Sequence, residues 1–166
     1  MGQARGERFG RQSTVKTYQT VSEVLEFVQS AHRRMADVCR KLSEQSGLEK
    51  TKLLMDVFAD HEEELQRVVG GAGAAQRADV LETWIQYVPT RPIEVILDEL
   101  ESREGLAWND ISQAILRLQE AIAQLWRELA QQVEAPIARE TLEALAEAEQ
   151  EMNRRLSQQI LSFQEM

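Results

Sequence analysis

Apolar side chains recur every three or four residues along four long segments, a spacing that predicts four amphipathic helices. Thr20 and Glu23 have the capping-box spacing at the start of the first segment, and Gly47 ends it. Asn109 is a good N-cap for the third, and Pro136 opens the fourth. The alternation of apolar and polar residues that is typical of a β-strand is absent, so the pattern predicts an all-α fold. The four predicted helices cover about residues 20–46, 49–69, 109–133 and 136–162.

The links between these segments predict two helical hairpins, residues 20–69 and 108–162, because short links make neighbouring helices antiparallel. A crossover over residues 70–107 joins them and holds two short helical pieces, ADVLETWIQYV and PIEVILDELES. The predicted architecture is an antiparallel four-helix bundle with a long helical crossover, forming one domain over residues 18–166. Residues 1–17, basic and rich in glycine, are expected to be a flexible arm.

The two hairpins also resemble each other. A shift of 87 residues lays VCRKLSEQ (38–45) on LWRELAQQ (125–132) and MDVFADHEEEL (55–65) on LEALAEAEQEM (142–152) without a gap. Amphipathic periodicity alone would not preserve the loop length, so an internal repeat is predicted.

One polar residue interrupts the core-facing stripe of each helix. His32 and Glu62 each lie 15 residues from Gly47, so both should sit at the same height in the bundle. The interruptions of the second hairpin are likewise 30 residues apart. Buried carboxylates require partners, so we expect the four side chains to meet in one layer. This polar layer consists of His32, Glu62, Gln119 and Glu149.

Three interpretations of the layer remain open. It is a metal-free hydrogen-bonded core, it holds one metal ion, or the helix register differs and no layer forms. In the second interpretation His32, Glu62 and Glu149 bind iron, manganese or zinc, and Gln119 adds a weak oxygen donor. His61 flanks the stripe, either as a half-buried residue among solvated acids or as a further ligand, one position off the seam.

The phrases DVFADHEEELQRV and EALAEAEQEMNRRL are similar to the second and fourth helices of the ferritin-like superfamily, rubrerythrin-like proteins in particular. The resemblance covers about residues 20–69 and 108–160. It implies two metal ions bound by Glu on the first and third helices and by Glu-x-x-His on the second and fourth. Glu62 and Glu149 match the motif glutamates.

The other ligand positions depart from that pattern. Leu65 and Met152 stand where the resemblance places histidine. His32 and Gln119 stand where it places the remaining glutamates. The resemblance therefore implies a degenerate site, and ferroxidase or peroxidase activity is not carried over.

Composition narrows the classes of partner. A net charge of -9 disfavours binding to nucleic acid and to anionic membranes. The single cysteine, Cys39, excludes an intramolecular disulfide and a cysteine-based zinc site. No membrane span or secretory signal is recognised, so a cytoplasmic protein is predicted.

These observations favour a non-catalytic structural or binding protein that has lost its dinuclear centre, with no catalytic residue and no cofactor. The first alternative is an oxidoreductase or metal-storage protein holding a single iron, manganese or zinc ion. The second is a helical adaptor for a partner protein. A homodimer is also considered, with Trp84, Tyr87 and Phe163 as candidate contacts.

Overall fold

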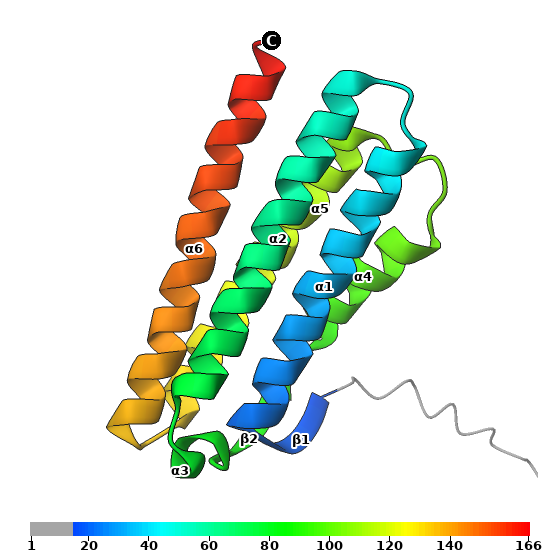
Figure 1. Cartoon of the computed structure of the whole chain (residues 1–166). Helices are drawn as coiled ribbons and strands as arrows, with labels where there is room; N and C mark the ends of the chain where they lie inside the picture. Colours follow the sequence, from blue (N-terminus) through cyan, green and yellow to red (C-terminus); the bar gives the residue numbers. More distant parts are fainter. Residues whose placement is uncertain (1–14) are drawn as a thin grey trace, which may run out of the picture.

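Four long antiparallel helices form the bundle of this chain (Figure 1), as the sequence predicts. The structure is a computed structural model that describes residues 15–166. Most of the predicted basic arm, residues 1–14, lies outside the described residues. Among the described residues no helix is long and apolar enough to cross a membrane. The bundle helices are α1 (Val21–Gln45), α2 (Glu49–Ala75), α5 (Trp108–Gln132) and α6 (Pro136–Gln164).

Local signals explain most of the helix starts. Thr20 is the N-cap of α1, and its Oγ1 accepts a hydrogen bond from the Glu23 N–H at 3.2 Å. The expected N-cap at Asn109 is wrong, because α5 begins after Ala107. There the Asp110 carboxylate accepts a hydrogen bond from the Ala107 N–H at 3.0 Å. Pro136 lies in the first turn of α6, where its missing N–H leaves no hydrogen bond unmade.

The predicted end of the second helix at residue 69, before Gly70, is wrong, since α2 continues to Ala75. A glycine inside a helix costs only about 1 kcal/mol relative to alanine, which packing can offset. At Gly70 an added Cβ would overlap the Gln29 side-chain amide of α1. The missing side chain therefore leaves room for the Gln29 amide, which donates a hydrogen bond to the Gln66 carbonyl at 3.5 Å.

The crossover contains the predicted helix PIEVILDELES, but the prediction that ADVLETWIQYV is helical throughout is wrong, as is the prediction of no β-strand. In order, the crossover holds α3 (Ala78–Leu81), then β2 (Trp84–Pro89), then α4 (Arg91–Ser102). β2 pairs antiparallel with β1 (Val15–Thr20), and Gln19 lies opposite Ile85. The run Trp-Ile-Gln-Tyr-Val suits a strand because aromatic and β-branched residues pack well on a pleated surface.

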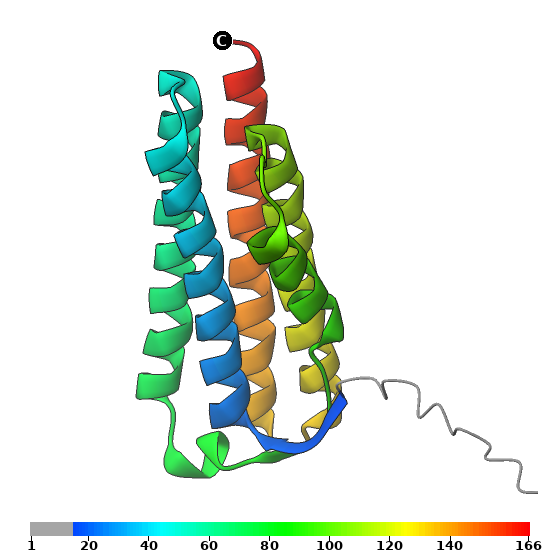
Figure 2. The same ribbon diagram turned by 90° about the vertical axis from the view of Figure 1, so that its right-hand side faces the viewer.

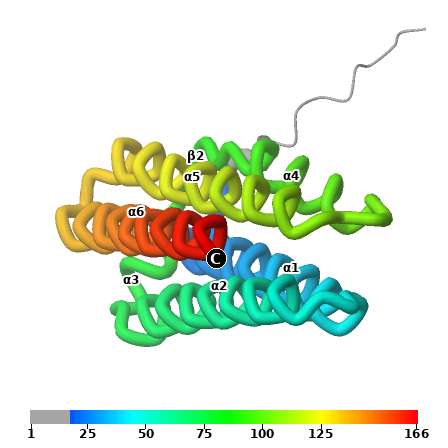
Figure 3. Tube along the Cα trace, turned by 90° about the horizontal axis from the view of Figure 1, so that it is seen from above, coloured from blue at the N-terminus to red at the C-terminus, as the bar shows by residue number. Residues whose placement is uncertain are grey.

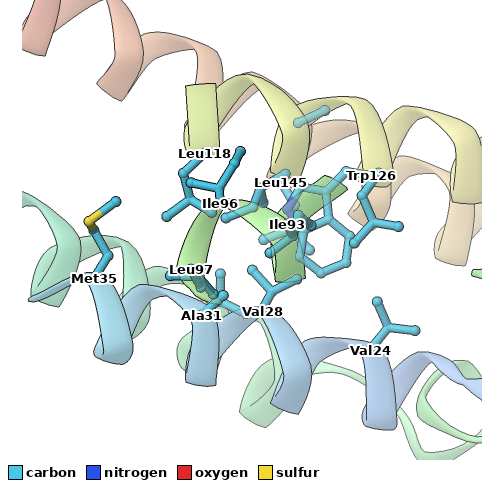
Figure 4. Packing of buried hydrophobic residues seen from close by; sticks show 14 of the residues in the cluster. Val24, Val28, Ala31, Met35, Ile93, Ile96, Leu97, Leu118, Trp126 and Leu145 are labelled. Carbon is cyan, nitrogen blue, oxygen red and sulfur yellow. The ribbon is translucent and has the colours of Figure 1, made fainter. Parts of the chain in front are cut away.

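The two hairpins lie side by side, with α1 and α2 on one side and α5 and α6 on the other (Figure 3). α4 runs alongside α5 and also contacts α1 (Figure 2). Ile93 and Leu97 of α4 are fully buried against this seam, near Trp126 of α5 (Figure 4). The apolar core therefore encloses the middle of the bundle, where the polar layer lies.

Candidate functional site

The four residues of the polar layer meet at mid-bundle, one from each long helix. His32, Glu62 and Gln119 are 0% exposed, and Glu149 is 1% exposed. The interpretation in which the register prevents a layer is therefore wrong. The layer is closed to solvent, so no external molecule reaches these side chains in this conformation.

The His32 imidazole lies between two carboxylates. Its Nδ1 is 2.5 Å from Glu62 Oε2, and its Nε2 is 2.5 Å from Glu149 Oε1. Gln119 Nε2 donates a hydrogen bond to Glu62 Oε1 at 3.1 Å. The His32–Glu149 and Gln119–Glu62 contacts each join one hairpin to the other. The layer therefore joins the two hairpins through hydrogen bonds between buried polar groups.

A carboxyl oxygen faces each ring nitrogen, and when both glutamates are ionised His32 donates on both sides, as the imidazolium form does. Burial lowers the pKa of His32, but the charges and hydrogen bonds of Glu149 and Glu62 outweigh it and raise the pKa to about 10. An imidazolium between two carboxylates leaves the three groups with less net charge than two unpaired carboxylates would carry.

Glu149 is the less well satisfied carboxylate. Its Oε2 is buried without a hydrogen-bond partner among the described residues, as is Gln119 Oε1. Burial accordingly raises the pKa of Glu149, although the charge and hydrogen bond of His32 oppose this shift.

The arrangement does not fit the dinuclear centre that the resemblance implies. Ligands sharing a metal at about 2.0–2.2 Å stand roughly 3 Å apart, wider than the 2.5 Å contacts between the His32 ring and its two carboxylates. Both ring nitrogens are also occupied by hydrogen bonds. At the expected histidine positions, Leu65 and Met152 are buried apolar residues. Within residues 15–166 no group of three or more His, Cys, Asp or Glu side chains is arranged to hold a metal ion.

The remaining candidates lie outside the layer. His61 is half-buried, and its Nδ1 contacts Met152 Sδ of α6. It is one position off the seam and does not join the polar layer. Cys39 is buried in the core, and burial, with a smaller contribution from Glu62, raises the pKa of its thiol. A raised pKa disfavours the thiolate, so Cys39 is a poor candidate nucleophile.

We expect the stability of the bundle to fall as pH rises from 7 to 10. The pKa of His32 is raised by folding, so its contribution is complete below pH 6.5 and is lost as pH approaches 10. One such proton changes the unfolding free energy by at most about 1.4 kcal/mol per pH unit. Urea unfolding at several pH values measures this slope.

The control for this slope is a variant with leucine at all four layer positions. It should show a flatter dependence over the same pH range, because the titrating groups are gone. Equal slopes for the two proteins would assign the pH dependence to residues outside the layer.

Comparison with known proteins supports the fold. A Thermotoga maritima protein, assigned as a ferritin-like diiron-carboxylate protein, has a crystal structure similar to this one, with a TM-score of 0.58 and 18% sequence identity. The match covers 86% of this chain and 95% of that chain. The chain therefore has the ferritin-like fold. No family model matches the sequence, and no curated protein matches it.

Proposed function

We propose that this chain is a non-catalytic structural or binding protein of the ferritin-like fold, in which the polar layer replaces a dinuclear metal centre. The observation that carries the proposal is the His32 ring, which contacts Glu62 on one side and Glu149 on the other at 2.5 Å. In this proposal the imidazolium supplies the positive charge that metal ions would otherwise supply to the two carboxylates.

The substitutions of the ligand pattern are consistent with that replacement. Four glutamates would place four negative charges in the layer, which metal ions would have to balance. Exchanging two of them for His32 and Gln119 removes two negative charges and adds one positive charge. The exchange also supplies hydrogen-bond donors to Glu62 and Glu149, which a metal-free core needs.

The closed layer supports a non-catalytic role. All four of its side chains are buried, and none of them lines either of the two pockets near the turn between α1 and α2. The buried Cys39 thiol offers no alternative reactive group, because burial raises its pKa.

The bound metal of the purified protein tests the proposal. Protein prepared without chelator should contain far less than one iron, manganese or zinc ion per chain, as measured by inductively coupled plasma mass spectrometry. Adding Fe(II), Mn(II) or Zn(II) should not raise its melting temperature, because only a ligand that binds the folded state stabilises it.

A second candidate is a protein that holds one metal ion, and the two partnerless oxygens favour it. Glu149 Oε2 and Gln119 Oε1 are oxygen donors inside the layer with no hydrogen-bond partner among the described residues. One equivalent of bound metal, lost in His32→Ala, would overturn the metal-free proposal and support this candidate. Metal retained in His32→Ala would indicate binding outside the layer and would count against the candidate.

A further inference from the structure

The junction between β1 and α1 is strained. β1 and β2 lie together at one end of the bundle (Figure 1), and β1 ends at Thr20 where α1 begins at Val21, with no loop between them. Close to this junction, Tyr18 has a φ of 65°. Among the described residues it is the one non-glycine residue with a positive φ. A side chain in this left-handed region meets a steric cost that glycine avoids, so Tyr18 marks a strained hinge between strand and helix.

Contacts of the Tyr18 ring do not offset this strain. Tyr18 is 63% exposed, so burial of its ring stabilises the fold little. The chain on the helix side of the hinge is firmly held. Thr20 Oγ1 accepts a hydrogen bond from the Glu23 N–H at 3.2 Å. The Val21 N–H donates to the Thr83 carbonyl at 3.0 Å. Relief of the strain therefore requires the segment before Tyr18 to move.

β2 is held by residues outside β1. Its Ile85 and Val88 side chains are 1% and 0% exposed and belong to the apolar core. The Tyr87 N–H donates to Gln132 Oε1 at 3.1 Å, and the Tyr87 carbonyl accepts from Gln132 Nε2 at 2.7 Å. Both backbone groups of Tyr87 thus face α5 rather than β1. β2 can therefore keep its place when the β1 segment leaves, and its free edge fits a strand of the sequence Val15–Thr17.

We propose that two copies of this chain exchange the segment Val15–Thr17, so that each segment pairs with β2 of the other copy. The register of the closed chain, with Lys16 opposite Val88 and Thr17 opposite Tyr87, is kept. Only the hinge differs, because Tyr18 takes an extended φ when the segment no longer has to reach its own β2. Strain in a short hinge favours such an exchange. The exchange does not involve the polar layer, so it stands apart from the proposed function.

Variants of the hinge test the role of strain. Pairing within one chain competes at an effective concentration on the order of millimolar, so the wild type should form a dimer that grows as the protein approaches that concentration. Sedimentation equilibrium measures its dissociation constant. Tyr18→Gly removes the steric cost of the closed hinge in both copies, and should raise that constant at least about tenfold.

Tyr18→Ala is the matched control for Tyr18→Gly. It removes the ring but keeps a Cβ in the left-handed region, so it should dimerise like the wild type. A wild type that stays monomeric at millimolar concentration would overturn the proposal. Equal dissociation constants for the Tyr18→Gly and Tyr18→Ala dimers would overturn it as well.

A disulfide identifies the exchanged strand directly. Because the Tyr87 backbone groups face Gln132, Thr17 and Tyr87 form a non-hydrogen-bonded pair with Cα atoms about 4.5 Å apart, within reach of a disulfide. The variant carries Thr17→Cys and Tyr87→Cys, with Cys39→Ala to remove the natural thiol. Oxidation at high protein concentration should give intrachain and interchain disulfides, which a nonreducing gel separates. Adding Tyr18→Gly should cut the interchain product to roughly a tenth, whereas collisional cross-linking would be unchanged.

Association through exposed aromatic side chains is the competing explanation. Trp84 and Tyr87 are 65% and 48% exposed on β2, and with Tyr18 they would join two copies without any exchange. In that case Tyr18→Ala would weaken the dimer as much as Tyr18→Gly, and the cysteine pair would form only intrachain disulfides. Either result would overturn strand exchange, and an interchain disulfide that Tyr18→Gly suppresses supports it.

Discussion

His32→Leu should destabilise the bundle by about 3–5 kcal/mol, because it leaves Glu62 and Glu149 buried without their shared cation. For a chain of this length, that loss corresponds to a fall in melting temperature on the order of 10 °C. Urea unfolding followed by circular dichroism at pH 7 measures the free energy directly. His61→Leu is the matched control, since it removes the chain's other histidine from a half-buried position outside the layer.

A rescue separates the lost cation from a packing defect. Leucine at all four layer positions removes both carboxylates together with His32 and Gln119, so no buried charge remains unpaired. This variant should recover most of the stability lost in His32→Leu, although added side-chain volume costs some of it. Two results would contradict the electrostatic account: a loss in His32→Leu no larger than in His61→Leu, or a four-leucine protein as unstable as the single variant.

The polar layer was predictable because each long helix has one polar residue in an otherwise apolar stripe. The turn after Ser46 then fixes the common height of His32 and Glu62. The pairing inside the layer was not predictable from the same pattern. His32 contacts Glu149 on α6, in the other hairpin. This pairing depends on the order of the helices around the bundle, which the spacing of apolar residues within one helix does not determine.

The two strands could not be predicted from the sequence, for a different reason. Val15–Thr20 and Trp84–Pro89 are far apart in the chain, and each is only six residues long. A short apolar run such as Trp84–Pro89 has no decisive periodicity, and pairing with a distant partner decides its conformation. Gln132 adds a second tertiary contact, since its side-chain amide donates to the Tyr87 carbonyl at 2.7 Å and accepts from the Tyr87 N–H at 3.1 Å. The internal repeat stays a prediction.

If the polar layer has replaced a metal centre, as proposed, restoring the missing ligands should create metal binding that the wild type lacks. The substitutions follow the positions that the ferritin-like resemblance identifies, with glutamate on the first and third helices and Glu-x-x-His on the second and fourth. Equilibrium dialysis with Mn(II) or Zn(II) should then detect about two ions per chain. The four substitutions are His32→Glu, Gln119→Glu, Leu65→His and Met152→His.

The four-substitution variant should be less stable than the wild type without metal and should be stabilised when metal is added. Without metal, four buried carboxylates repel one another, so the variant should melt well below the wild type. Metal at about 100 times its dissociation constant should restore about 2.7 kcal/mol. The control carries the two glutamate substitutions alone, and it should bind metal more weakly because it lacks the nitrogen ligands. If the wild type binds as much metal as the four-substitution variant, His32 has not replaced the metal. If that variant folds and binds no metal, the polar layer does not occupy the position of a metal centre, and the chain shares only its fold with the diiron protein.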